Sequence, residues 1–197
     1  MFASIYGPLL PFLLLLSTTS VTSFNLTPKI KKAIDACYPP TSYNTRRSIA
    51  YDAAIASTTT FTPEGIPLGG DAMVYGEFDL PFFARLLSKA RPERGDTFVD
   101  IGSGAGRIVL AAALLAPHEL ANCHGIELSA PLHDAAVAAR YVFEDIGEED
   151  DDGGPPPPIA PCQYTLSNCM EGEGLEALAT ANVAFSYAVT WANDETH

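Results

Sequence analysis

Basic residues are scarce in this chain and are absent from its last part. The 197 residues include 11 Lys and Arg against 24 Asp and Glu, and no Lys or Arg follows Arg140. Half of the acidic residues lie beyond that position, and most of these are clustered between Glu144 and Asp152. Neutralising a nucleic-acid backbone requires clustered cations, so direct nucleic-acid binding is not expected.

Cysteine is also sparse, and the spacing of the four cysteines does not match that of metal ligands. The four cysteines include no C-x₂-C pair, and the last two are seven residues apart. Zinc sites of the common kinds need closely spaced ligand pairs, so no metal site is predicted.

Long hydrophobic runs are missing except at the N-terminus. Residues 9–16 are mostly leucine, and residues 21–23 form a small-residue pattern typical of signal-peptide cleavage after Ser23. The run is shorter than the ~20 apolar residues that span a bilayer, so no stable membrane span is expected once the leader is removed. The sequence therefore predicts entry into the secretory pathway. One alternative is an uncleaved N-terminal membrane anchor. A second alternative is import into a complex plastid, because residues 24–32 resemble the bipartite leader of such proteins.

The remainder is interpreted as two parts. Residues 24–74 are taken as a mainly helical N-terminal extension, and residues 75–197 as the domain that carries the functional signal. Within that domain, residues 147–160 combine repelling acids with Gly153, Gly154 and four prolines, which cannot donate sheet hydrogen bonds. This segment is therefore predicted to be a solvated loop.

Residues 97–116 carry the strongest functional signal. An apolar, strand-like run reaches Asp100, three glycines alternate at Gly102, Gly104 and Gly106, and an Ala/Leu-rich helix follows. Such glycines let a ligand lie against bare backbone, facing the free N–H groups of the first helical turn. The dinucleotide fingerprint G-x-G-x-x-G would need glycine where Arg107 stands. A tight turn without a ligand is the alternative interpretation.

The pattern D-x-G-x-G-x-G resembles motif I of the class I S-adenosylmethionine-dependent methyltransferases. A second predicted strand, residues 123–127, ends in Glu127, whose two carboxylate oxygens can accept from both ribose hydroxyls of a cofactor. The resemblance implies S-adenosyl-L-methionine as the cofactor. Asp100 and Glu127 also suit a cationic sulfonium ligand, because a negative local field favours its binding.

Upstream, Tyr75-Gly76-Glu77 precedes the helix that leads to the glycine loop. Together with residues 98–106 it resembles the disruptor-of-telomeric-silencing family, the histone lysine methyltransferases without a SET domain, over residues 75–141. In that family a Tyr-Gly-Glu loop packs over the cofactor. The alternative is that Tyr75 is a packing residue and that Gly76-Glu77 is a turn before the helix. The residues predicted to hold the cofactor are Tyr75, Glu77, Asp100, Gly102, Ser103, Gly104, Gly106, Glu127 and Asn168.

The fold class predicted is α/β, a parallel Rossmann-like sheet covered on both faces. Helices are expected over residues 28–37, 80–90, 129–143 and 174–180, and later strands over residues 163–167 and 182–189. The resemblance implies the strand order 3-2-1-4, which is half of the family's seven-stranded sheet, and a C-terminally truncated chain is the hypothesis that follows. This order makes Cys123 and Cys162 neighbours; a disulfide is one reading, and free buried thiols are the favoured one.

The resemblance further implies that the Tyr187 hydroxyl or the Trp191 ring faces the methyl group, with packing as the alternative for both. Here the chain departs from the family, because Arg107 replaces a glutamine and no Lys-rich tail is present to hold a nucleosome. The predicted function is methyl transfer to a protein lysine or a small-molecule acceptor. The alternative is a truncated, inactive module that binds the cofactor or acts as an interaction protein.

Overall fold

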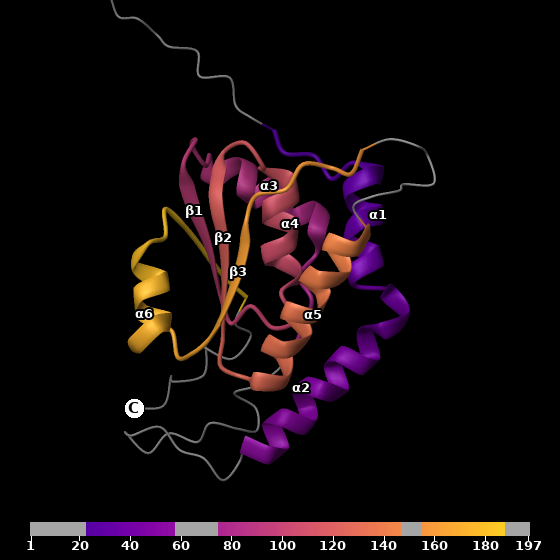
Figure 1. Ribbon diagram of the computed structural model, residues 1–197, viewed down its shortest axis with the longest axis vertical. Coiled ribbons are helices and arrows are strands. Elements are labelled where there is room, and N and C mark those ends of the chain that lie inside the picture. The colour runs from indigo at the N-terminus through magenta and orange to yellow at the C-terminus, as the bar shows by residue number, and fades with distance from the viewer. Residues whose placement is uncertain (1–22, 58–74, 147–154, 188–197) are drawn as a thin grey trace, which may run out of the picture.

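The computed structural model describes residues 23–57, 75–146 and 155–187 (Figure 1). The predicted leader at residues 1–23 and the acidic centre of the predicted loop fall almost wholly outside these ranges. In chain order the elements are α1 (Pro28–Cys37), η1 (Pro40–Ser42), α2 (Tyr43–Ser57), α3 (Leu80–Ala90), β1 (Asp96–Ile101), α4 (Arg107–Leu115), β2 (Leu120–Glu127), α5 (Ala130–Ile146), β3 (Cys162–Leu166), α6 (Gly172–Ala179) and β4 (Val183–Ser186).

The four strands form one parallel sheet in the order β3-β2-β1-β4. Phe98 of β1 is in register with Cys123 of β2 on one side and with Val183 of β4 on the other. The predicted fold class and strand order are therefore confirmed. Because all strands run the same way, their carboxyl ends meet at one edge of the sheet, where open α/β folds bind ligands.

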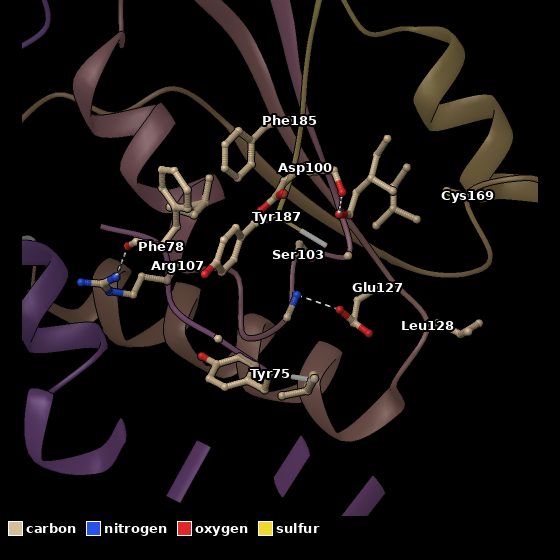
Figure 2. Close-up of a pocket in the computed structure, with 18 of the residues that line it drawn as sticks. Tyr75, Phe78, Asp100, Ser103, Arg107, Glu127, Leu128, Cys169, Phe185 and Tyr187 are labelled. Atoms are coloured by element: carbon tan, nitrogen blue, oxygen red, sulfur yellow. Dashed lines mark hydrogen bonds between the residues drawn. The ribbon is translucent and has the colours of Figure 1, made fainter. Parts of the chain in front are cut away.

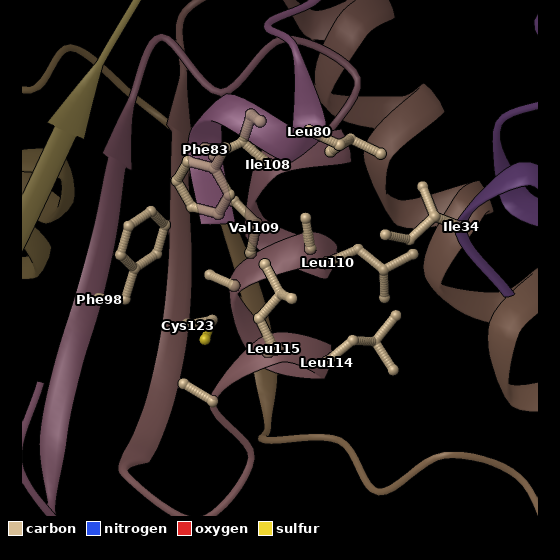
Figure 3. Packing of buried hydrophobic residues seen from close by; sticks show 14 of the residues in the cluster. Ile34, Leu80, Phe83, Phe98, Ile108, Val109, Leu110, Leu114, Leu115 and Cys123 are labelled. Carbon is tan, nitrogen blue, oxygen red and sulfur yellow. The ribbon is translucent and has the colours of Figure 1, made fainter. Parts of the chain in front are cut away.

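The helices are divided unequally between the two faces of the sheet (Figure 1). Helices α3, α4 and α5 pack on one face, and α1 packs against α4 and α5 to enclose the larger core. Helix α6 covers the other face with Ala177 against Val99 and Ile126. In the larger core, Phe98 and Cys123 of the strands face Phe83 of α3 and the apolar side chains of α4 (Figure 3). Residues 108–115 of α4 are all buried, as expected for a helix that is apolar all round.

Local signals in the sequence explain where two helices begin. The Thr27 hydroxyl accepts from the N–H of Ile30 at 3.2 Å, and a Pro follows at the first position of α1. The Asp79 carboxylate accepts from the N–H of Phe82 at 2.8 Å at the start of α3. Both helices have the predicted bounds.

Helix α2 was not located by the sequence, although a helical extension was expected. Its apolar residues do not form one stripe, because Tyr51 and Ile55 are exposed while Ala50 is buried. Residues 155–160 of the predicted loop have no regular structure, and the N–H of Ala160 donates to the carbonyl of Ala113.

All four cysteines are free. Cys123 and Cys162 are register partners on neighbouring strands, as the strand order implies, and the favoured reading of free thiols agrees with the structure. Burial raises the pKa of Cys162 to about 12 and raises that of Cys123 further. Among the described helices, none combines the length and the apolar character needed to cross a bilayer.

Candidate cofactor site

A pocket of about 280 Å³ lies at the carboxyl edge of the sheet (Figure 2). This volume is close to the lower end of the ~300–1,000 Å³ typical of small-molecule sites. Most of the residues predicted from the sequence line it: Tyr75, Glu77, Asp100, Gly102, Ser103, Gly104, Glu127, Asn168 and Tyr187. The structure thus brings together segments that lie more than 100 residues apart in the chain.

The glycine loop between β1 and α4 approaches the pocket with its backbone. Gly104 has φ +55°, and a Cβ atom placed there would lie 3.0 Å from the Tyr75 ring. The Ser103 hydroxyl is buried and has no hydrogen-bond partner among the described residues. The interpretation as a tight turn gives no reason for a buried hydroxyl group that lacks a partner. A ligand lying against this loop would supply a hydrogen-bond partner for the Ser103 hydroxyl.

Gly106, one of the residues predicted to hold the cofactor, has a packing role in the structure. It caps α4 at φ +83°, and a Cβ atom there would lie 2.7 Å from the Tyr164 ring and 2.8 Å from Ala136. It is not among the residues that line the pocket. The structure therefore places Gly106 beneath the loop, where it allows α4 to pack closely against β3 and α5.

Glu127 joins the ends of β1 and β2. One carboxylate oxygen accepts from the N–H of Gly104 at 2.7 Å, and the other accepts from the N–H of Ser129 at 2.8 Å. The side chain is buried and still lines the pocket. A carboxylate has about four lone-pair sites, so each oxygen can accept a further hydrogen bond from a ligand.

Asp100 is the second carboxyl group of the pocket, and only 3% of its surface is exposed. Burial, followed by the nearby charge of Glu127, raises the pKa of Asp100 to about 8. Ionising a buried carboxyl group is costly because the charge loses its contact with water. A cation placed beside Asp100 would offset that cost. Strongly shifted carboxyl groups in a cleft are typical of functional sites.

Glu77 is held between two arginines. The Arg46 guanidinium donates to one Glu77 oxygen at 2.6 Å, and the Tyr75 hydroxyl donates to the same oxygen at 3.0 Å. Arg107 lies 3.6 Å from the other oxygen and donates to the carbonyl of Phe78. Glu77 is therefore a structural acceptor as well as part of the pocket lining.

An aromatic cluster closes the side of the pocket towards β4. The Phe78 ring lies 5.3 Å from the Phe185 ring and 5.0 Å from the Tyr187 ring, both edge-on (Figure 2). Tyr187 is 46% exposed, so it lies at the rim. Trp191, the other candidate catalytic residue, lies outside the described residues.

On the side towards β3, the pocket is apolar with one amide. Leu128, Leu132 and Ile126 contribute the apolar surface, and the Asn168 side-chain oxygen accepts from the N–H of Met170 at 3.0 Å. That bond sets the orientation of the amide beside an apolar surface suited to a flat ring. Among the described residues, no group of three or more His, Cys, Asp and Glu could hold a metal ion.

Sequence reasoning missed Arg46, Ala50, Phe78 and Leu128 as parts of the site. In the sequence, Arg107 stands out only because it replaces a glutamine of the family pattern. The structure places it in the pocket wall. Arg46 and Glu77 are 31 residues apart, so no local pattern pairs them.

Comparison with known proteins supports the motif-based resemblance. Residues 69–146 match the family model of the histone methylation protein DOT1. A histone-lysine N-methyltransferase of Gibberella zeae, H3 lysine-79 specific, is 42% identical over 59 residues, which are 29% of this chain and 12% of that protein. The chain thus spans about an eighth of the length of this curated relative. The resemblance to this family is confirmed over the matched segment.

Two solved structures also show a distant similarity to this chain. An RNA methyltransferase from Salinibacter ruber, in complex with S-adenosyl-L-homocysteine, is 24% identical over 58% of this chain and 61% of its own, with a TM-score of 0.41. An rRNA methyltransferase from Streptomyces viridochromogenes is 16% identical over 70% of this chain and 65% of its own, with a TM-score of 0.39.

Proposed function

We propose that this chain, which is similar over residues 69–146 to the histone methylation protein DOT1, is a class I S-adenosylmethionine-dependent methyltransferase that methylates a lysine side chain. A small-molecule amine is the other acceptor of matching chemistry. The observation that carries the proposal is the bond from the Gly104 N–H to Glu127 beside the buried Asp100. It assembles a glycine loop and two carboxyl groups at the ends of adjacent parallel strands.

The chemistry of the pocket fits the ribose, sulfonium and adenine parts of S-adenosylmethionine. The remaining lone pairs of Glu127 suit the two ribose hydroxyls, and the buried Asp100 carboxyl suits the cationic sulfonium half. Leu128 and Leu132 offer an apolar surface for the adenine ring. The unpartnered Ser103 hydroxyl provides one more polar group at the glycine loop.

When bound, the cofactor supplies a methyl group on a cationic sulfur, which an acceptor attacks in line. The chain itself contributes orientation and exclusion of water. Tyr75 packs against Gly104 from one side, and the rings of Phe78 and Tyr187 form the other wall. Such a wall suits the aliphatic stem of a lysine, and partial desolvation lowers the pKa of its ammonium group towards the neutral, nucleophilic amine.

The first test is a calorimetric titration of S-adenosylmethionine into the full chain. Glu127→Gln is expected to weaken binding by about 10-fold or more, because the amide NH₂ replaces one accepting oxygen and faces the N–H of either Gly104 or Ser129. Glu176→Gln, which makes the same chemical change on the exposed surface of α6, is the matched control and is expected to bind like the wild type.

The second test is transfer of a labelled methyl group to histones, lysine peptides and small amines. Methyl-lysine in any protein acceptor supports the proposal, and labelling confined to a small amine favours the other acceptor class. No heat with the wild-type chain would contradict cofactor binding itself. Binding without transfer to any acceptor would favour the inactive cofactor-binding module.

A further inference from the structure

We propose that helix α2 of the N-terminal extension forms one wall of the cofactor pocket, and that Arg46 is a positioning residue that holds Glu77 and, through it, Tyr75. This inference rests on the proposed function, because it takes the pocket to be the S-adenosylmethionine site. It assigns a role in cofactor binding to a segment for which neither the sequence motifs nor the comparisons provide one; the family match begins only at residue 69.

One face of α2 is turned towards the pocket. Tyr43, Arg46 and Ala50 lie three and four residues apart, so they share one side of the helix. The Tyr43 ring lies 6.4 Å from the Tyr75 ring, and Ala50 is 3% exposed and lines the pocket itself. This face therefore contacts the site at successive turns, with Arg46 at its centre.

The Arg46 guanidinium is buried and has partners on two sides. Towards the extension, it donates to the Ser42 hydroxyl at 2.5 Å and to the carbonyl of Pro39 at 3.3 Å. Towards the pocket, it pairs with one Glu77 oxygen at 2.6 Å, with side-chain exposures of 9% for Arg46 and 14% for Glu77. Removing one partner from such a pair leaves a poorly solvated charge, which is energetically costly. The pair therefore keeps Arg46 and Glu77 in a fixed relative position.

Glu77 connects Arg46 to Tyr75, whose ring covers the glycine loop. The oxygen that accepts from Arg46 also accepts from the Tyr75 hydroxyl, and the Tyr75 ring contacts Gly104 closely enough that a Cβ there would lie 3.0 Å away. Burial and the charge of Glu77 raise the pKa of Tyr75, so the phenol keeps the proton that it donates. Arg107 steadies the other Glu77 oxygen from α4.

The test measures the affinity for S-adenosylmethionine of the full chain and of three variants: Arg46→Met, Glu77→Gln and the double variant. Arg46→Met is expected to weaken binding by about 10-fold, since a charge-assisted bond that orients the pocket wall is lost. Because Arg46 acts through Glu77, the double variant is expected to bind like Glu77→Gln alone. Arg47→Met, the exposed neighbour on the same helix, is the matched control and should stay within about 2-fold of the wild type.

A second readout separates positioning from a general loss of stability. Hydrogen exchange of residues 75–79, measured without cofactor, should be faster in Arg46→Met than in Arg47→Met at temperatures well below unfolding. Arg46→Lys keeps the charge but not the planar fork, and it should recover part of the affinity. It also replaces Arg46→Met if that variant does not fold.

Unchanged affinity in a folded Arg46→Met, or losses that simply add in the double variant, would overturn the inference. A wild-type chain that binds no S-adenosylmethionine would instead refute the proposed function. In that case the exchange of residues 75–79 still reports whether Arg46 positions the loop.

Discussion

The backbone N–H of Gly104 donates a 2.7 Å hydrogen bond to the Glu127 carboxylate, which ties the loop after β1 to the end of β2. Strands β1 and β2 are adjacent and parallel, and both residues line the pocket. Substitutions at this junction should therefore affect ligand binding more than folding.

Gly104→Ala should reduce the affinity for S-adenosylmethionine by about 10-fold or more. The new methyl group would press on the Tyr75 ring at 3.0 Å, in a left-handed conformation that also costs about 1–2 kcal/mol. Gly172→Ala is a close control, because Gly172 has φ +51° and open space around it at the start of α6. Calorimetry should show a similar loss of stability for both variants and a loss of binding for Gly104→Ala alone.

Asp100→Asn should raise the melting temperature at pH 8 by at least about 3 °C and abolish cofactor binding. The folded-state pKa of about 8 exceeds the unfolded value of ~3.9, so the unfolded chain releases this proton first as pH rises. The Asp100 contribution therefore lowers stability progressively between about pH 4 and pH 8, and asparagine removes that effect.

The control for this variant is Asp134→Asn, whose side chain is 81% exposed. Melting curves recorded from pH 4.5 to 8.5 should converge for wild type and Asp100→Asn at the acid end and separate towards pH 8. A constant difference between the two proteins across this range would contradict the raised pKa.

Gly106→Ala should be more destabilising than Gly104→Ala, with a fall in melting temperature on the order of 10 °C. Its Cβ would meet both the Tyr164 ring and Ala136 at less than 3 Å, with little room for either to move. Thermal unfolding measured beside Gly104→Ala tests this ranking. Equal melting temperatures for the two variants would show that Gly106 is not a packing residue.

Tyr187→Phe should leave the kcat for methyl transfer within about 2-fold, whereas Tyr187→Ala should raise the KM for the acceptor. The Tyr187 ring is held against Phe78, and a Cβ at Gly76 would lie 3.3 Å from it, so the ring shapes the wall. Steady-state kinetics with the best acceptor distinguish the two roles. A large fall in kcat for Tyr187→Phe would instead assign a proton-transfer role to the hydroxyl.

Local signals predicted most elements of the fold, because each depends on residues within a few positions of one another. Thr27 and Asp79 cap their helices as expected, and the glycine loop lies between β1 and α4. The missed helix, α2, lacks a continuous apolar stripe. It is stabilised by contacts with α5 and by the Arg46–Glu77 pair, neither of which leaves a periodic pattern.

By itself, the sequence determined the strand–glycine loop–helix unit and the two carboxyl groups, Asp100 and Glu127, at strand ends, since spacing along the chain is sufficient to predict both. Only the tertiary structure decided that Gly106 packs beneath the loop, that burial raises the pKa of Asp100 to about 8, and that α2 reaches the pocket through Arg46. These properties depend on desolvation and on contacts between residues far apart in the chain. Such contacts form only when the elements pack together.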